Sequence, residues 1–109
     1  MLEKIEIESI NMLSGGPCMA TIKSIGVLET EGFVPLIEGA DAAVKAANVE
    51  LVEWRKIGRG YVSFVIEGEV AAVRSAIEAG RAAATAVGTV ISEIIIPRPV
   101  DELKTTWKK

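Results

Sequence analysis

The chain has 109 residues, of which 50% are hydrophobic and 5% aromatic, and its formal net charge is −3. This length suits one domain with one core, and an acidic balance argues against a protein that chiefly binds nucleic acid. The chain has no histidine and a single cysteine, Cys18. A histidine base, an intramolecular disulfide and a multi-cysteine metal site within one chain are therefore excluded, and we expect no metal, no cofactor and no catalytic activity.

The location of the protein is also constrained. No run of residues approaches the ~20 apolar positions that a membrane span needs. The first residues, Met1–Glu6, alternate charged and apolar side chains, unlike the charged-then-apolar layout of a signal peptide. We therefore expect a cytoplasmic protein with no membrane segment.

Residues 1–18 are interpreted as an N-terminal extension and linker, and residues 19–109 as a single domain. Ser14-Gly15-Gly16-Pro17 has the composition of a flexible linker. Ahead of it, Ile5 and Ile7 could form an extra strand or a short helix, and Met19 could be a downstream start. An ordered extension, a mobile arm and an over-long gene model all remain open at this point.

The first half of the remaining chain predicts a strand, a helix and two further strands. Residues 20–29 alternate roughly and carry β-branched side chains, which is typical of a strand. A helix is expected from Phe33 to about Asn48, because apolar residues recur at helical spacing, namely at Phe33, Ile37, Ala40, Val44 and Ala47. Strands are expected over residues 49–57 and 61–66.

The second half adds a helix and a strand. Gly68 and Glu69 open a helix, with the carboxylate near its positive end, and Gly88 ends it. Its core stripe is expected at Val70, Val73, Ile77, Ala84 and Val87. Residues 89–96 form a strand that Pro97 and Pro99 terminate, and residues 100–107 add a short helix.

The predicted order is β-α-β-β-α-β, the ferredoxin-like arrangement. This is an α+β fold with two helices on one face of an antiparallel sheet. Both helices contain pairs or runs of alanine, such as Ala42-Ala43 and Ala82-Ala83-Ala84. Small residues permit close approach of neighbouring backbones, and alanine also has the highest helix propensity, so two explanations stay open.

The most informative segment is Lys56-Ile57-Gly58-Arg59-Gly60-Tyr61, between two predicted strands. Glycine on both sides of Arg59 favours a tight hairpin with this one charged side chain at its tip. Such a tip suits the presentation of a charge to a ligand, a partner or a symmetry axis. An ordinary solvated turn arginine is the alternative.

Several stretches combine with this hairpin in order along the chain. They are Ser24–Gly32, Ala40–Leu51, Lys56–Gly60, Ala79–Ala84 and Ile96-Pro97-Arg98-Pro99. Together they closely resemble the hexamer-forming shell proteins of bacterial microcompartments, over residues 20 to about 103. The resemblance implies the strand order given above, and flat cyclic hexamers that tile into facets.

The resemblance also implies roles for individual residues. The hairpin would line a central pore through Lys56, Ile57, Gly58, Arg59 and Gly60, and the pore would pass small polar or anionic metabolites. Lys45, Asn48 and Arg98 would lie at hexamer edges, where neighbouring hexamers meet. The implied partners are further copies in a homohexamer, other shell proteins of the compartment and enzymes inside it, in the shell of a cytoplasmic microcompartment.

The sequence departs from the common family pattern in two places. Many relatives carry a small residue such as serine where this chain has Arg59. Some carry a pore cysteine that holds an iron–sulfur cluster, but Cys18 lies outside the hairpin. A small-molecule-sensing regulatory module with the same fold is the alternative function, and an enzyme using Glu29, Glu38 or Asp41 as acid–base groups is a third, weaker one.

Overall fold

The computed structural model describes residues 23–103. Their six main elements follow the predicted order: β1 (Ser24–Glu31), α3 (Phe33–Ala46), β2 (Glu50–Gly58), β3 (Tyr61–Gly68), α4 (Val70–Val87) and β4 (Thr89–Ile96). A helical turn follows at residues 101–103, within the predicted C-terminal helix. The expectations for residues 1–22, including Cys18 and Met19, and for residues 104–109 lie outside the described residues.

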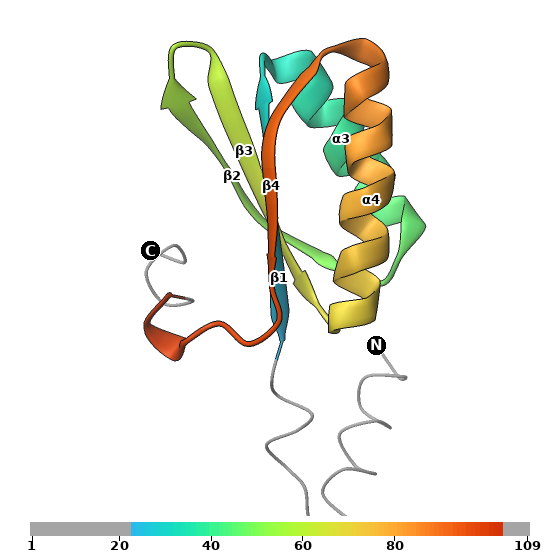
Figure 1. Ribbon diagram of the computed structural model, residues 1–109, viewed down its shortest axis with the longest axis vertical. Coiled ribbons are helices and arrows are strands. Elements are labelled where there is room, and N and C mark those ends of the chain that lie inside the picture. Colours follow the sequence, from blue (N-terminus) through green and yellow to red (C-terminus); the bar gives the residue numbers. More distant parts are fainter. Residues whose placement is uncertain (1–22, 104–109) are drawn as a thin grey trace, which may run out of the picture.

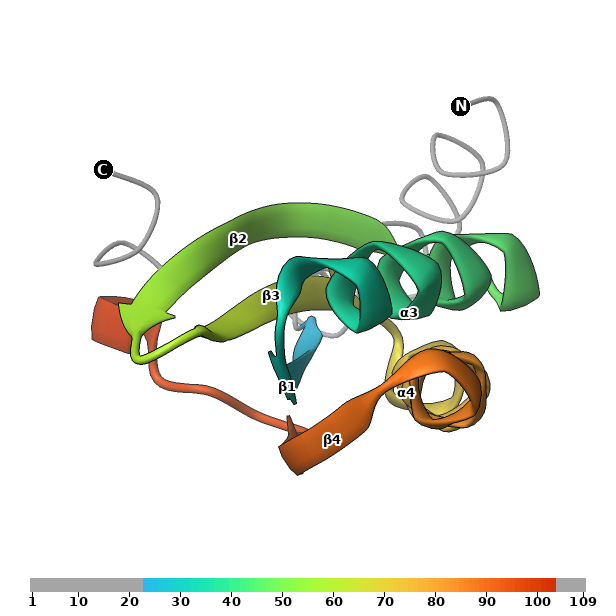
Figure 2. The same ribbon diagram turned by 90° about the horizontal axis from the view of Figure 1, so that it is seen from above.

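The strands form one antiparallel sheet in the order β2-β3-β1-β4. Helices α3 and α4 lie together on one face of this sheet (Figures 1 and 2). The prediction of a ferredoxin-like α+β fold is therefore confirmed. In this order β2 and β4 are the two edge strands, while the central strands β1 and β3 carry most of the buried positions.

The hydrophobic core lies between the sheet and the helices. Leu28 of β1 and Phe64 and Ile66 of β3 are buried there. The helices contribute Leu36 and Ile77, each only 1% exposed, together with smaller residues. Burial of these side chains is the main term that holds the helices on the sheet, since each large apolar side chain contributes about 1.5–3 kcal/mol.

The predicted helices are present, but the prediction of which helix residues are buried was partly wrong. Val73, Ile77 and Ala84 of α4 are buried as expected, whereas Val70 and Val87 at its two ends are exposed. In α3 the buried residues are Pro35, Leu36, Gly39 and Ala43. Phe33, Ile37 and Val44, which mark the apolar recurrence in the sequence, are 50%, 48% and 39% exposed.

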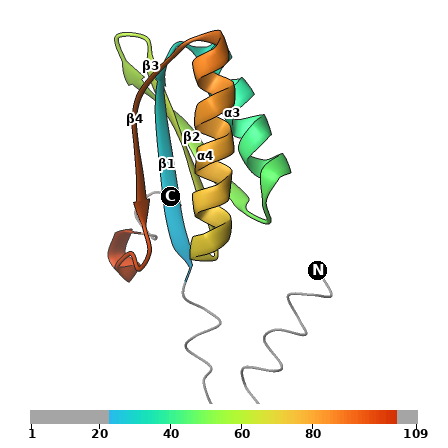
Figure 3. The same cartoon turned by 45° about the vertical axis from the view of Figure 1, so that its right-hand side comes forward.

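Helices α3 and α4 lie side by side (Figure 3), and they pack closely where two glycines meet. A Cβ atom on Gly80 would lie 2.8 Å from the carbonyl oxygen of Gly39, and one on Gly39 would lie 3.1 Å from that of Gly80. Ala43 and Ala84 flank this contact. The small residues therefore allow the backbones of α3 and α4 of the same chain to approach each other closely.

Gly88 ends α4 as predicted, but for a different reason. Its φ of −174° is extended backbone, so it is not the left-handed cap that glycine usually provides. A Cβ atom there would lie 2.5 Å from Cγ of Pro35 in α3. Glycine is therefore required at this position by close packing of the two helices.

Candidate functional site

The hairpin between β2 and β3 has an unusual backbone. Gly58 pairs with Tyr61, so Arg59 and Gly60 form a two-residue loop. Their φ angles are +59° and +81°, and that of Gly58 is +122°. Positive φ at both loop residues is typical of a type I′ turn, whose twist matches that of the flanking strands. The predicted tight turn is confirmed, with Arg59 in the left-handed region.

The loop of the hairpin is held by the turn that follows β1. The backbone N–H of Gly32 donates a 2.7 Å hydrogen bond to the carbonyl oxygen of Gly60. The buried hydroxyl of Thr30 in turn donates to the carbonyl oxygen of Gly32 at 3.0 Å. These two bonds attach the loop to the central strand, so the tip has a fixed position on the domain.

The tip itself is cationic and open. Arg59 and Lys56 are exposed, and neither side chain has a hydrogen-bonding or ion-pairing partner within residues 23–103. Nothing lies within 4 Å of a Cβ atom built on Gly58 or Gly60. Ile57 beside them is 55% exposed. The hairpin thus presents a guanidinium and an ammonium group that are available to an anion or to another molecule.

Lys45 lies near the end of α3 and has a partner of its own. Its Nζ atom is 2.9 Å from Oδ2 of Asp41, one helical turn earlier. This hydrogen bond and the negative charge of Asp41 raise the pKa of the Lys45 ammonium above its ordinary value. Lys45 is therefore charged at neutral pH, and two of its three donors remain for other acceptors.

Arg98 and Asn48 are both exposed at the ends of elements. Arg98 lies two residues beyond β4, and its guanidinium has no partner within the described residues. The chain is held there because the hydroxyl of Ser24 donates a 2.8 Å hydrogen bond to the carbonyl oxygen of Pro97. Asn48 lies in the short connection between α3 and β2.

The strand register shows that these residues form two separate groups. Glu31 pairs with both Tyr61 and Thr89, so the hairpin, the start of α3 and the start of β4 share one end of the sheet. At the other end Ile25 pairs with Glu67 and Ile96. Lys45, Asn48 and Arg98 belong to this second end. The structure therefore brings Lys56–Gly60 together and sets them apart from the other three candidates.

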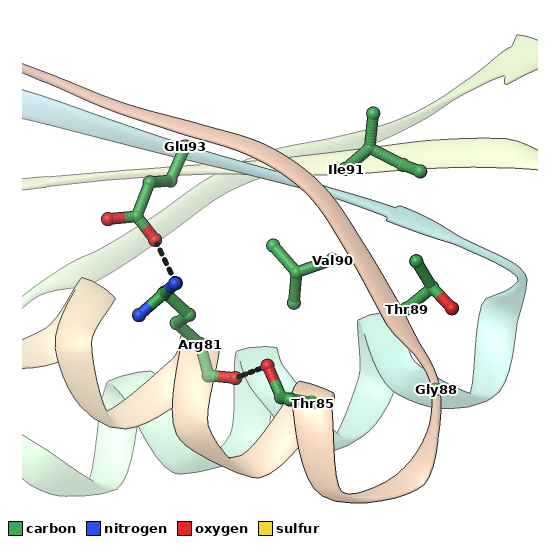
Figure 4. A pocket seen from close by; sticks show the side chains of 7 residues that line it. All are labelled: Arg81, Thr85, Gly88, Thr89, Val90, Ile91 and Glu93. Atoms are coloured by element: carbon green, nitrogen blue, oxygen red, sulfur yellow. Dashed lines mark hydrogen bonds and ion pairs between the residues drawn. The ribbon is translucent and has the colours of Figure 1, made fainter.

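A groove of about 520 Å³ lies between the second half of α4 and β4 (Figure 4). Arg81 and Glu93 span it through an ion pair whose Nε–Oε1 distance is 3.1 Å. Val90 and Glu93 extend toward α4, whereas Ile91 extends away from it (Figure 4). Sequence analysis did not identify this groove, because it depends on how α4 and β4 pack.

Other kinds of site find no support in the part of the chain that the structure describes. Residues 23–103 contain no cluster of three or more cysteine or carboxylate side chains that could hold a metal ion. Among the same residues no helix is both long enough and apolar enough to cross a membrane.

Sequence reasoning missed two supporting contacts. The Asp41–Lys45 pair has the i,i+4 spacing of a helical ion pair, so the sequence did contain a signal for it. The Gly32–Gly60 hydrogen bond joins residues that are far apart in the chain, and no local pattern indicates it.

Comparisons with known proteins agree with this architecture. The BMC domain family model matches residues 24–99. The microcompartment shell protein PduA of Citrobacter freundii is 49% identical over 87 residues, which cover 80% of this chain and 94% of that protein. The shell protein EutM of Escherichia coli K12 is 45% identical over 86 residues, covering 79% of this chain and 89% of that protein.

A solved structure is also similar. The crystal structure of a microcompartment protein from Desulfitobacterium hafniense matches with a TM-score of 0.71 and 38% identity. The match covers 77% of this chain and 48% of the other, so this chain spans about half of that protein. Since the family model covers all six elements and the relatives match over most of their length, the chain belongs to the BMC-domain family of microcompartment proteins.

Proposed function

We propose that this protein is a structural component of a bacterial microcompartment shell. It forms cyclic hexamers that tile into facets together with other shell proteins, around enzymes inside the compartment. The hairpin residues Lys56–Gly60 line a central pore, and Lys45, Asn48 and Arg98 form contacts between hexamers. The protein catalyses no reaction in this proposal.

The observation that carries this proposal is the separation of the two groups of candidate residues. The hairpin lies at one end of the sheet and Lys45, Asn48 and Arg98 at the other. In a ring of subunits, one end of each domain points toward the axis and the other toward the rim. A hairpin at the axis therefore leaves the remaining three residues at the rim, where neighbouring rings meet.

The charge of the hairpin indicates which molecules would pass through the proposed pore. Six copies of Arg59 around one axis give a cationic opening. At a spacing of about 8 Å in water, each adjacent pair repels by only about 0.5 kcal/mol, so the ring tolerates them. An anion on the axis would relieve this repulsion and accept charge-assisted hydrogen bonds. Small anions should therefore pass more readily than neutral molecules of the same size.

The mass of the protein in solution tests the assembly. Native mass spectrometry of the purified chain at micromolar concentration should give a hexamer. A stable dimer or trimer would instead favour the regulatory module, which needs no six-fold ring.

A substitution in the hairpin tests the pore. In shells containing this protein, Arg59→Ser should slow the passage of a carboxylate or phosphate ester more than that of a neutral aldehyde or alcohol. Equal effects on both solutes would mean that Arg59 only narrows the opening. A crystal grown with sulfate should show an anion beside Arg59 on the axis.

A further inference from the structure

We propose that residues 104–109, here called the tail, pack across the outer face of the sheet and place a lysine beside the buried carboxylate of Glu67. The outer face is the face of the sheet away from α3 and α4. This inference concerns a contact within one chain, and it does not depend on the proposed ring.

Strand alternation assigns Glu67 to the outer face. Successive side chains of a strand point to opposite faces of a sheet. In β3, Phe64 and Ile66 lie in the core against the helices, so Val65 and Glu67 face the other way. Val65 and Glu67 are nevertheless only 8% and 6% exposed. A segment other than the two helices therefore covers this part of the sheet.

The cover increases toward the end of the sheet where the chain leaves β4. At the hairpin end Glu31 is exposed and Tyr61 is half-buried, whereas Ile25 at the opposite end is 1% exposed. Beyond β4 the chain turns to the outer side, and the helical turn at residues 101–103 lies away from α3 and α4 (Figure 2). The chain therefore enters the tail from the outer side of the sheet.

Glu67 is the most buried carboxylate of this face, and residues 23–103 give it neither a hydrogen bond nor an ion pair. Three other carboxylates of the outer face have partners within the same residues, namely Glu29 with Ser92, Glu53 with Arg55 and Glu50 with Lys23. The register also places Glu50 directly opposite Glu67, which adds a second negative charge. A buried carboxylate without a partner is unfavourable, so this position favours a cation from elsewhere in the chain.

The sequence of the tail, Lys-Thr-Thr-Trp-Lys-Lys, supplies both a cation and an apolar cover. Next to Glu67 the register aligns Val65, Val27 and Ile94 in an apolar row across three strands. Ile94 is 55% exposed, so part of this row is open. Trp107 would cover the row while a lysine reaches Glu67.

The length of the tail is sufficient for this contact. Six extended residues span about 20 Å. Four adjacent strands span about 14 Å, because neighbouring strands lie about 4.8 Å apart. The tail can therefore reach from the β4 side of the outer face to Glu67 on β3.

The fluorescence of Trp107 tests the position of the tail. Trp54 and Trp107 are the two tryptophans of the chain, so Trp107 is the single emitter in Trp54→Phe. Acrylamide should quench this emission several-fold less than that of a free peptide with the tail sequence. Adding Glu67→Gln should increase the quenching, whereas Glu53→Gln, at a carboxylate that Arg55 already pairs, is the matched control and should not. Quenching equal to that of the free peptide would overturn the proposal.

A double-mutant cycle identifies the cation. Glu67→Gln and a variant with all three tail lysines changed to glutamine should each lower the midpoint of urea unfolding. The combined variant should lower it no further than the larger single effect. Additive effects would assign Glu67 to another cation, such as Lys23, and an increased midpoint for Glu67→Gln would mean that its carboxylate has no partner. Either result would overturn the proposed pair.

Dilution separates this contact from the assembly. Protection of Trp107 within one chain should not change with protein concentration. Protection that disappears on dilution would place the tail of another copy on this face and would overturn the contact within one chain. A wild type that is not hexameric in native mass spectrometry would contradict the proposed ring, and protected Trp107 in that protein would still support the tail contact.

Discussion

Arg59 occupies a backbone conformation that suits glycine or asparagine far better than arginine. Its φ of +59° lies in the left-handed region, which costs an ordinary residue about 1 kcal/mol. The side chain makes no hydrogen bond or ion pair within the described residues that would offset this cost. A residue held in this conformation at an exposed tip, with no hydrogen bond from its side chain, is a candidate for a function of its charge.

This strain leads to a stability prediction. Arg59→Asn should raise the free energy of unfolding by up to about 1 kcal/mol, because asparagine adopts the left-handed region more readily. Arg59→Ser is the matched control, since it removes the same charge without this backbone preference and should give little of the gain. Denaturant midpoints of the two variants would show the difference. An equal gain in both would assign the cost to repulsion between charges rather than to the backbone.

At the scale of the elements, the crossing of α3 and α4 depends on Gly39 and Gly80. Gly80→Ala would place a Cβ atom 2.8 Å from a backbone oxygen, which cannot move aside as a flexible side chain would. We expect a loss of about 1–3 kcal/mol, the usual cost of overpacking, despite the better helix propensity of alanine. Thermal or chemical unfolding measures this loss. Ser75→Ala, at an exposed position of α4, should change stability by less than about 0.5 kcal/mol.

The sequence predicted the type and order of the elements better than their buried faces. Apolar residues at helical spacing predict a helix whether or not the core of the same domain covers them. Helix α3 was therefore predicted correctly, although Phe33, Ile37 and Val44 lie outside the core. Its buried side is made of Leu36, Gly39, Ala43 and Pro35, of which two are small enough to be overlooked in an apolar pattern. A single chain contains no local signal that separates core residues from residues that another copy could cover.

The candidate site was predictable where it depends on local chemistry. Glycines around Arg59 specify the turn, and the strand order fixes which candidates share an end of the sheet. The anchor from Gly32 to Gly60 and the requirement for glycine at position 88 arise from packing between distant segments. No pattern within a short window carries that information.

At the scale of the whole molecule, the proposed domain boundary gives a simple test. The matched family domain spans residues 24–99, and the described core lies between Ile25 and Ile95. A chain starting at Met19 should therefore keep its fold, and its midpoint of thermal unfolding should stay within a few degrees of that of the full chain. A large decrease would show that residues 1–18 contribute to the domain.

The contacts between hexamers rest in this proposal on Lys45 and Arg98. Lys45→Ala and Arg98→Ala should reduce sheet formation and leave the hexamer intact, because both residues lie at the end of the sheet away from the hairpin. Each lost hydrogen bond to a charged group costs about 1.5–3 kcal/mol, and repetition along every edge multiplies the effect. Electron microscopy of overexpressing cells should show sheets for the wild type and fewer for each variant. Loss of hexamers instead would assign the residue to the ring.

The dependence of sheet formation on pH follows from the charge of Lys45. Asp41 raises the pKa of this lysine. The contribution of the charged Lys45 ammonium to sheet formation is therefore complete below the ordinary lysine pKa, and it is lost as the pH rises through the raised pKa. The chain has no histidine to titrate near neutrality. Sheet formation should thus stay constant from about pH 6 to about pH 9 and decline only above about 10.4. Light scattering of hexamers across this pH range measures sheet formation. Lys45→Ala should remove most of the decline at alkaline pH. A decline between pH 6 and 9 could not be caused by titration of Lys45.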